Sequence, residues 1–154
     1  MSRQTKRWIK FGRFVLLTLY IAVLIYVCFF SEVYGRDVIT SYYRYNLIPF
    51  KEIRRFYIYR DVVGIRAFLA NLFGNVLAFM PYGLFMPILR PKLRRMNRMF
   101  LAAFLLSLTI EITQLLTRVG SFDVDDLILN TAGGIAGYLL FYIMNKIRSK
   151  WDGA

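Results

Sequence analysis

Four runs of apolar residues, each nearly or fully long enough to cross a bilayer, dominate the hydrophobic pattern of the chain. They cover residues 14–30, 67–89, 99–117 and 127–144. A transmembrane helix needs about 20 apolar residues, because each residue adds about 1.5 Å along a hydrocarbon core of about 30 Å. The pattern therefore predicts an all-α polytopic membrane protein, with four transmembrane helices in a single domain over residues 1–154.

The composition is typical of a membrane protein and excludes several kinds of catalytic and metal-binding site. The chain is 58% hydrophobic yet carries a net charge of +12, so apolar and basic residues must be segregated along it. The basic residues flank the apolar runs instead of interleaving with exposed aromatics, which argues against a nucleic-acid partner. The chain has no His and one Cys, so imidazole catalysis, His-ligated metal sites and an intramolecular disulfide are excluded.

The distribution of Lys and Arg predicts the orientation of the spans. The N-terminal tail, the loop 90–98 and the C-terminal tail carry five, five and three of them, whereas the loop 118–126 has one Arg and three Asp. Short loops rich in Lys and Arg stay in the cytoplasm. We therefore expect both termini to be cytoplasmic, although the long loop 31–66, placed outside, carries seven basic residues and four acidic ones.

Three local patterns refine the expected architecture. In the first loop, Phe50, Ile53, Phe56 and Tyr57 recur at helical spacing, which predicts a short interfacial helix or, as the alternative, a plain connecting loop. Prolines inside the second run predict a kinked or partly broken helix. Glycines in the fourth run predict close helix packing. The residues concerned are Pro81, Pro87, Gly133, Gly134 and Gly137.

Polar residues inside the spans are the strongest candidates for function. Glu111, Gln114 and Arg118 fall on one face of the third span at i, i+3 and i+7. A charged side chain in a span costs about 2.5–3.5 kcal/mol on insertion scales, so Arg118 is a candidate partner for Glu111. Asn71 and Asn75 share one face of the second span.

The polar residues of different spans are expected to lie at similar depths in the membrane. At about 1.5 Å per residue, the polar positions of the second, third and fourth spans, Asn130 included, fall at similar depth in the outer half. The segment Asp123, Asp125 and Asp126 lies just outside them. Three interpretations of these aspartates remain open: capping of the fourth helix, a polar site shared with Glu111 and Arg118, and a site for a hard cation.

The same residues carry a resemblance to a known family. Residues 46–50 read NLIPF, residues 71–83 read NLFGNVLAFMPYG, and residues 123–134 read DVDDLILNTAGG. Between them lie Ser107, Glu111, Gln114 and Arg118 in the third span and at its end. In this order and spacing, the chain resembles the VanZ-like family of bacterial membrane proteins over residues 46–137. The resemblance implies a multi-pass protein of the bacterial cytoplasmic membrane that contributes to resistance against the glycopeptide teicoplanin.

The favoured hypothesis for function is a non-enzymatic envelope protein. Its outward-facing polar pocket would bind the drug, a membrane lipid or a lipid-linked cell-wall precursor, without cofactor or metal. The alternative is a small membrane enzyme that modifies a lipid-linked precursor, with Glu111 as the acid or base. A channel ranks last, because the polar residues form no continuous path. The expected ligand-binding residues are Asn46, Asn71, Asn75, Glu111, Gln114, Arg118, Asp123, Asp125, Asp126 and Asn130.

Overall fold

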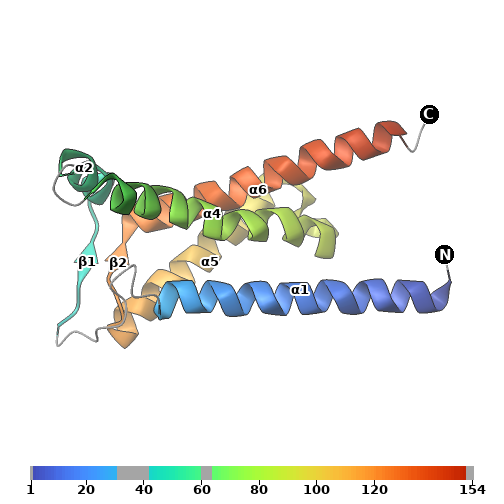
Figure 1. Ribbon diagram of the computed structural model, residues 1–154, viewed down its shortest axis with the longest axis horizontal. Coiled ribbons are helices and arrows are strands. Elements are labelled where there is room, and N and C mark those ends of the chain that lie inside the picture. The colour runs from blue at the N-terminus through green and yellow to red at the C-terminus, as the bar shows by residue number, and fades with distance from the viewer. Residues whose placement is uncertain (1, 31–41, 60–63, 152–154) are drawn as a thin grey trace.

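The computed structural model describes residues 2–30, 42–59 and 64–151, and its framework is four long helices. They are α1 (Arg3–Phe29), α4 (Ile65–Leu89), α5 (Met96–Thr117) and α6 (Val124–Trp151). Each contains a stretch long and apolar enough to cross a bilayer, which confirms the four predicted spans (Figure 1). The shorter elements are β1 (Tyr45–Asn46), α2 (Lys51–Ile58), η2 (Pro91–Arg94) and β2 (Phe122–Asp123).

The helices extend beyond the apolar runs that predicted them. α1 already begins at Arg3, where the Ser2 hydroxyl accepts a hydrogen bond from the Thr5 N–H at 3.1 Å, and α6 continues to Trp151. Their terminal turns therefore carry the basic tails. α4 runs through Pro81 and Pro87 as one element, so of the predicted kink or partial break only the kink stays a prediction. Packing against neighbouring helices can compensate for the lost hydrogen bonds.

Close contact between α4 and α6 forms the centre of the bundle. A Cβ atom added at Gly133 would lie 2.2 Å from the Val76 carbonyl oxygen, and one at Gly137 would lie 1.9 Å from that of Met80. Only glycine permits this approach of two backbones, so the predicted packing role of these glycines is confirmed. α5 closes the other side through a core cluster of Met99, Ala103, Tyr138 and Phe141.

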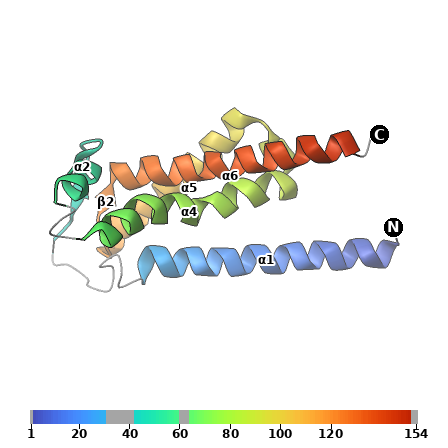
Figure 2. The ribbon, with the colours of Figure 1, turned by 45° about the horizontal axis from the view of Figure 1, so that its top comes forward.

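α1 runs along one side of the other helices (Figure 2). Leu24 and Cys28 pack with Phe79 of α4 in a second buried cluster. The Tyr20 hydroxyl also donates a hydrogen bond to the Ala78 carbonyl oxygen at 3.0 Å. α1 is thus tied to the bundle by a few specific contacts, while most of its apolar surface is left for lipid.

The two ends of the bundle differ in character. Both chain termini lie at one end, which we call the basic end, and α2, β1 and β2 lie at the other, which we call the polar end (Figure 1). At the polar end β1 pairs with β2 in parallel, with Tyr45 opposite Phe122 and Asn46 opposite Asp123. The long helices confirm the predicted all-α membrane architecture, to which this two-residue pairing is a small local addition. α2 confirms a helix in the first loop, and its position in the membrane interface stays a prediction.

Candidate functional site

Most of the polar residues expected to form a site are gathered at the polar end, and they are buried. The relative exposure of Gln114 is 0%, and that of Glu111 and of Asp125 is 1%. They come from α5 and α6 and meet residues of α4 and of the segment that leads into α2. Burial of polar groups is costly unless they are hydrogen-bonded, so their partners decide what the cluster does.

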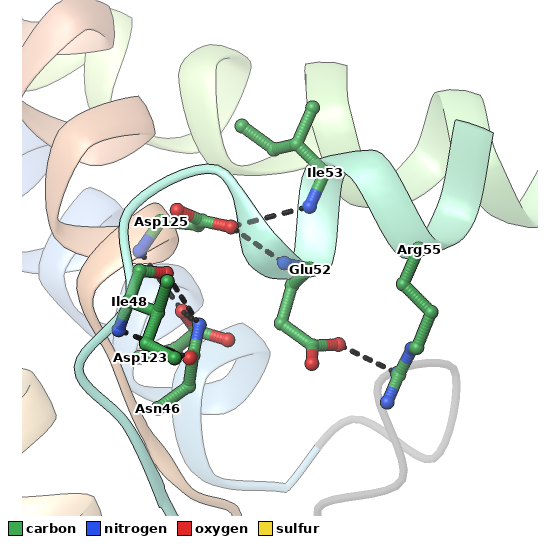
Figure 3. A network of polar contacts seen from close by, with 7 residues as sticks. All are labelled: Asn46, Ile48, Glu52, Ile53, Arg55, Asp123 and Asp125. Atoms are coloured by element: carbon green, nitrogen blue, oxygen red, sulfur yellow. Dashed lines mark hydrogen bonds and ion pairs between the residues drawn. The ribbon is translucent and has the colours of Figure 1, made fainter. Parts of the chain in front are cut away.

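Asp125 organises the start of α2 from a position more than 70 residues away in the sequence. One carboxylate oxygen accepts hydrogen bonds from the backbone N–H groups of Glu52 at 2.8 Å and Ile53 at 3.2 Å (Figure 3). The other oxygen accepts from the N–H of Phe50, the residue that precedes the helix in a left-handed conformation. Asp125 therefore caps α2, whereas the predicted capping of the fourth helix is provided by Asp123, whose carboxylate accepts the Asp125 N–H at 2.8 Å at the start of α6.

Asp123 connects the strand pair to the third span. Its carboxylate oxygen Oδ1 accepts from Asn46 Nδ2 at 3.0 Å and from the Asp125 N–H at 2.8 Å. Its own backbone N–H donates to Glu111 Oε2 at 2.9 Å. Asn46 in turn exchanges two hydrogen bonds with the backbone of Ile48. Asn46, Asp123, Asp125 and Glu111 thus form one connected network. A polar site shared by the aspartates and Glu111 was one of the three interpretations that the sequence left open.

The other expected residues form separate pairs beneath this network. Asn75 donates to Asp126 at 2.5 Å, and Asn130 donates to the hydroxyl of Ser107 at 3.0 Å. Gln114 Nε2 donates to the Cys28 carbonyl oxygen of α1 at 2.7 Å, so the first span also reaches the polar end. The amide oxygens of Gln114 and Asn130 are buried without a hydrogen-bond partner in the described structure. Asn71 belongs to α4, but its side chain lies outside the described part of the chain.

Arg118 does not pair with Glu111, so that expectation is wrong. Its guanidinium lies 4.7 Å above the ring of Tyr43 and donates to the Tyr43 hydroxyl at 3.5 Å. α5 ends at Thr117, and Arg118 adopts a left-handed conformation with φ of 60°. Helical i, i+7 spacing no longer applies past that point. Arg118 therefore fastens the segment before β1 to the end of α5.

The described polar network does not form a metal site. Among residues 2–30, 42–59 and 64–151, no three His, Cys, Asp or Glu side chains come together in a way that could hold a metal ion. The carboxylates instead accept hydrogen bonds from backbone N–H groups and asparagine amides. The role of Glu111 as an acid or base stays a prediction.

The pKa of Asp123 gives the network a pH dependence. Burial raises this pKa above its usual value of 3.8, against the opposing effect of the hydrogen bonds from Asp125 and Asn46. The folded state then binds a proton more tightly than the unfolded state, so the free energy of unfolding should fall as the pH rises from 3.8 through the folded-state pKa. Asp123→Asn should remove this slope. Unfolding of both proteins across that pH range measures it, and equal slopes would contradict the prediction.

An open cavity lies beside the buried network, against α2. It has a volume of about 460 Å³ and combines basic and apolar side chains. The sequence pattern placed Phe50 in a predicted interfacial helix, but none of the lining residues was predicted to bind a ligand. All of the lining residues belong to α2, the turn before it and the residue after it, and the Asp125 carboxylate holds the first turn of that segment through backbone N–H groups. Its lining residues are Ile48, Pro49, Phe50, Lys51, Arg54, Arg55, Ile58 and Tyr59.

Comparison with known proteins decides the family. The VanZ/LLP1 family matches residues 17–145, which is most of the chain. The chain belongs to the VanZ-like family. It is also 31% identical to Protein VanZ of Enterococcus faecium over 133 residues, which cover 85% of this chain and 74% of that protein. No solved structure matches the chain. Four helices suited to crossing a bilayer and membership of this family identify a membrane protein.

Proposed function

We propose that this protein contributes to resistance against teicoplanin-type glycopeptides by binding the drug, a lipid or a cell-wall precursor at the polar end of the bundle. The family to which the chain belongs is linked to teicoplanin resistance. The observation that carries the proposal is the cavity on α2, a helix whose first turn is hydrogen-bonded to the buried carboxylate of Asp125. Its volume of about 460 Å³ is within the usual range for ligand pockets, about 300–1,000 Å³.

The chemistry of this cavity suits an amphipathic ligand with a negative group. Lys51 and Arg54 offer positive charge, while Ile58 and Tyr59 offer apolar and aromatic surface. Arg55 is engaged by Glu52 in an ion pair of 2.6 Å. A lipid-linked precursor joins an apolar tail to a phosphate-bearing head, and a lipoglycopeptide joins an acyl chain to a polar peptide. Either fits a mixed surface at the boundary between lipid and water.

In this proposal the buried polar residues position the cavity instead of contacting the ligand. Asp125 fixes the start of α2, and Asp123 and Asn46 fix the segment that leads into it. Glu111 supports Asp123 through its backbone N–H. The ligand-binding pocket that we propose therefore lies on the exposed surface of α2, one layer further out than the side chains expected to form it.

Resistance assays with cavity variants test the proposal. The gene would be expressed in a susceptible bacterium that lacks a VanZ homologue, and the minimal inhibitory concentration of teicoplanin would be measured. Lys51→Gln/Arg54→Gln removes two charges worth about 1 kcal/mol each at a lipid surface, or roughly a 30-fold loss in affinity. We expect the resistance conferred by the wild type to be largely lost.

The matched control removes two basic residues elsewhere in the same half of the chain. Arg44 and Arg66 are exposed and do not line the cavity. Arg44→Gln/Arg66→Gln should retain resistance at equal membrane levels. The proposal is wrong if the wild type confers no resistance, or if both double variants behave alike when immunoblots show equal amounts in the membrane.

A further inference from the structure

Three arginines from separate elements converge on one cavity at the basic end of the bundle. The cavity has a volume of about 350 Å³ and lies among α1, η2, α4 and α6. Arg13 reaches it from α1, Arg94 from η2 and Arg148 from the last turns of α6. These residues are far apart in the sequence, and the termini-bearing ends of α1 and α6 lie at the same end of the molecule (Figure 2). The fold therefore gathers a cationic cluster from dispersed parts of the chain.

The remaining wall of this cavity is largely apolar. The positive groups thus face a surface that is suited to hydrocarbon rather than to water. A ligand that combines a negative head with an apolar chain would satisfy both parts. The apolar lining residues are Leu84, Ile88, Phe141 and Met144.

Arg94 shows that the cluster is fixed in place by specific contacts. Its Nε donates to the Pro87 carbonyl oxygen at 3.2 Å, and its guanidinium lies 5.9 Å from the centre of the Phe141 ring. The Arg94 carbonyl oxygen also accepts a hydrogen bond from the Tyr138 hydroxyl at 2.8 Å. Held at its backbone and at Nε, this side chain directs its other N–H groups to no hydrogen-bond acceptor among the described residues. Guanidinium groups bind phosphate oxygens in pairs, with defined geometry.

Basic side chains predominate at this end of the bundle. Segments 1–13, 90–98 and 145–151 contain thirteen Lys and Arg and no Asp or Glu. No acidic side chain among the described residues lines the cavity. Asp152 follows in the sequence, outside the described residues. Basic pockets between transmembrane helices are a recurrent way to bind phosphate headgroups.

We propose that this cavity binds the phosphate headgroup of an anionic phospholipid, with an acyl chain along its apolar wall. Arg13, Arg94 and Arg148 contact the phosphate, and Phe141 and Met144 contact the hydrocarbon. The site lies at the opposite end from α2, so it does not depend on the proposed function. It binds a structural lipid that joins α1 to the rest of the bundle, because Arg13 is contributed by α1 and the other two by the remaining helices.

Lipid binding to the purified full-length protein tests this site. The protein would be delipidated in detergent and titrated with phosphatidylglycerol, phosphatidylcholine or inorganic phosphate, and bound species would be counted by native mass spectrometry. We expect one tightly bound phosphatidylglycerol per chain, and much weaker binding of phosphatidylcholine and of inorganic phosphate. Arg13→Gln/Arg94→Gln/Arg148→Gln should weaken phosphatidylglycerol binding by about 100-fold, from about 1 kcal/mol for each basic residue.

The matched control removes the same charge from the same parts of the chain. Arg7, Arg95 and Lys150 are exposed at the basic end and do not line the cavity. Their triple Gln variant should bind phosphatidylglycerol within about threefold of the wild type, since general surface attraction is all it loses. Equal weakening in both triples, binding of the two lipids with equal affinity, or inorganic phosphate binding as tightly as lipid would overturn the proposal.

A charge-preserving variant covers the case in which the Gln triple fails to fold. Arg13→Lys/Arg94→Lys/Arg148→Lys keeps the net charge and the pattern of basic loops, but it loses the forked donors of guanidinium. We expect this variant to reach the membrane and to bind phosphatidylglycerol about tenfold more weakly than the wild type. Binding unchanged from the wild type would show that no arginine site exists in the cavity.

Discussion

Asp125→Ala is expected to produce the largest loss of stability of any single change at the polar end, about 3–5 kcal/mol. The substitution removes the acceptor for three backbone N–H groups, those of Phe50, Glu52 and Ile53. An unsatisfied buried donor costs about 1–3 kcal/mol, and part of this cost is relieved if α2 separates from the bundle and its donors reach water. Unfolding of the purified protein by denaturant measures the total loss.

Amide hydrogen exchange locates the effect of Asp125→Ala. Protection should fall across residues 50–58 while the amides at the centres of α4 and α6 stay protected. Glu52→Gln is the matched control, because it changes an acid in the same segment whose carboxylate forms a partly exposed ion pair with Arg55 and does not cap α2. Such pairs contribute about 0–1 kcal/mol. If the two variants lose equal stability, Asp125 has no special role in holding α2.

Gly137→Ala is expected to cost about 3 kcal/mol, at the upper end of the usual range for overpacking. The added Cβ would lie 1.9 Å from the Met80 carbonyl oxygen and 3.0 Å from the Leu84 nitrogen. Both atoms belong to the α4 backbone, which cannot move aside as a side chain can. α4 and α6 must therefore separate, and denaturant unfolding together with the thermal midpoint measures the loss.

Two controls separate backbone collision from the general effect of replacing glycine. Gly12→Ala in α1 should be neutral or slightly stabilising, since nothing lies within 4 Å of its added Cβ and alanine favours helix. Gly134→Ala meets a side chain instead, the Cβ of Ala103 at 2.6 Å. Adding Ala103→Gly should restore much of the stability lost in Gly134→Ala. A neutral Gly137→Ala, or a Gly12→Ala as harmful as Gly137→Ala, would contradict this account of the packing.

The four spans could be predicted because they depend on local properties of the chain. The length and hydropathy of a segment decide whether it can cross a bilayer, and no knowledge of partners is needed. The packing of Gly133 and Gly137 could be predicted for a similar reason, since small residues on one helix face favour a close neighbour. The identity of that neighbour, α4, required the structure.

The hydrogen-bond partners of the polar residues could not be predicted, because they depend on long-range contacts and on where each helix ends. Similar depth correctly brought Glu111 and Asn130 to the same end of the bundle, but each found its own partner, the Asp123 backbone and Ser107. The pairing of Arg118 was mispredicted because α5 ends one residue before it. The role of Asp125 could not be predicted, since its partners lie more than 70 residues earlier in the chain.

The parallel pairing of β1 with β2 also constrains the order in which the protein can be completed during synthesis. Asn46 and its partner Asp123 are 77 residues apart, so the ribosome adds α4 and α5 between them. The segment around β1 must therefore wait, with its pairing groups exposed, until the start of α6 has been made. Contacts between such distant residues form late. Chains that stop before residue 123 should insert three spans but leave the polar end unassembled.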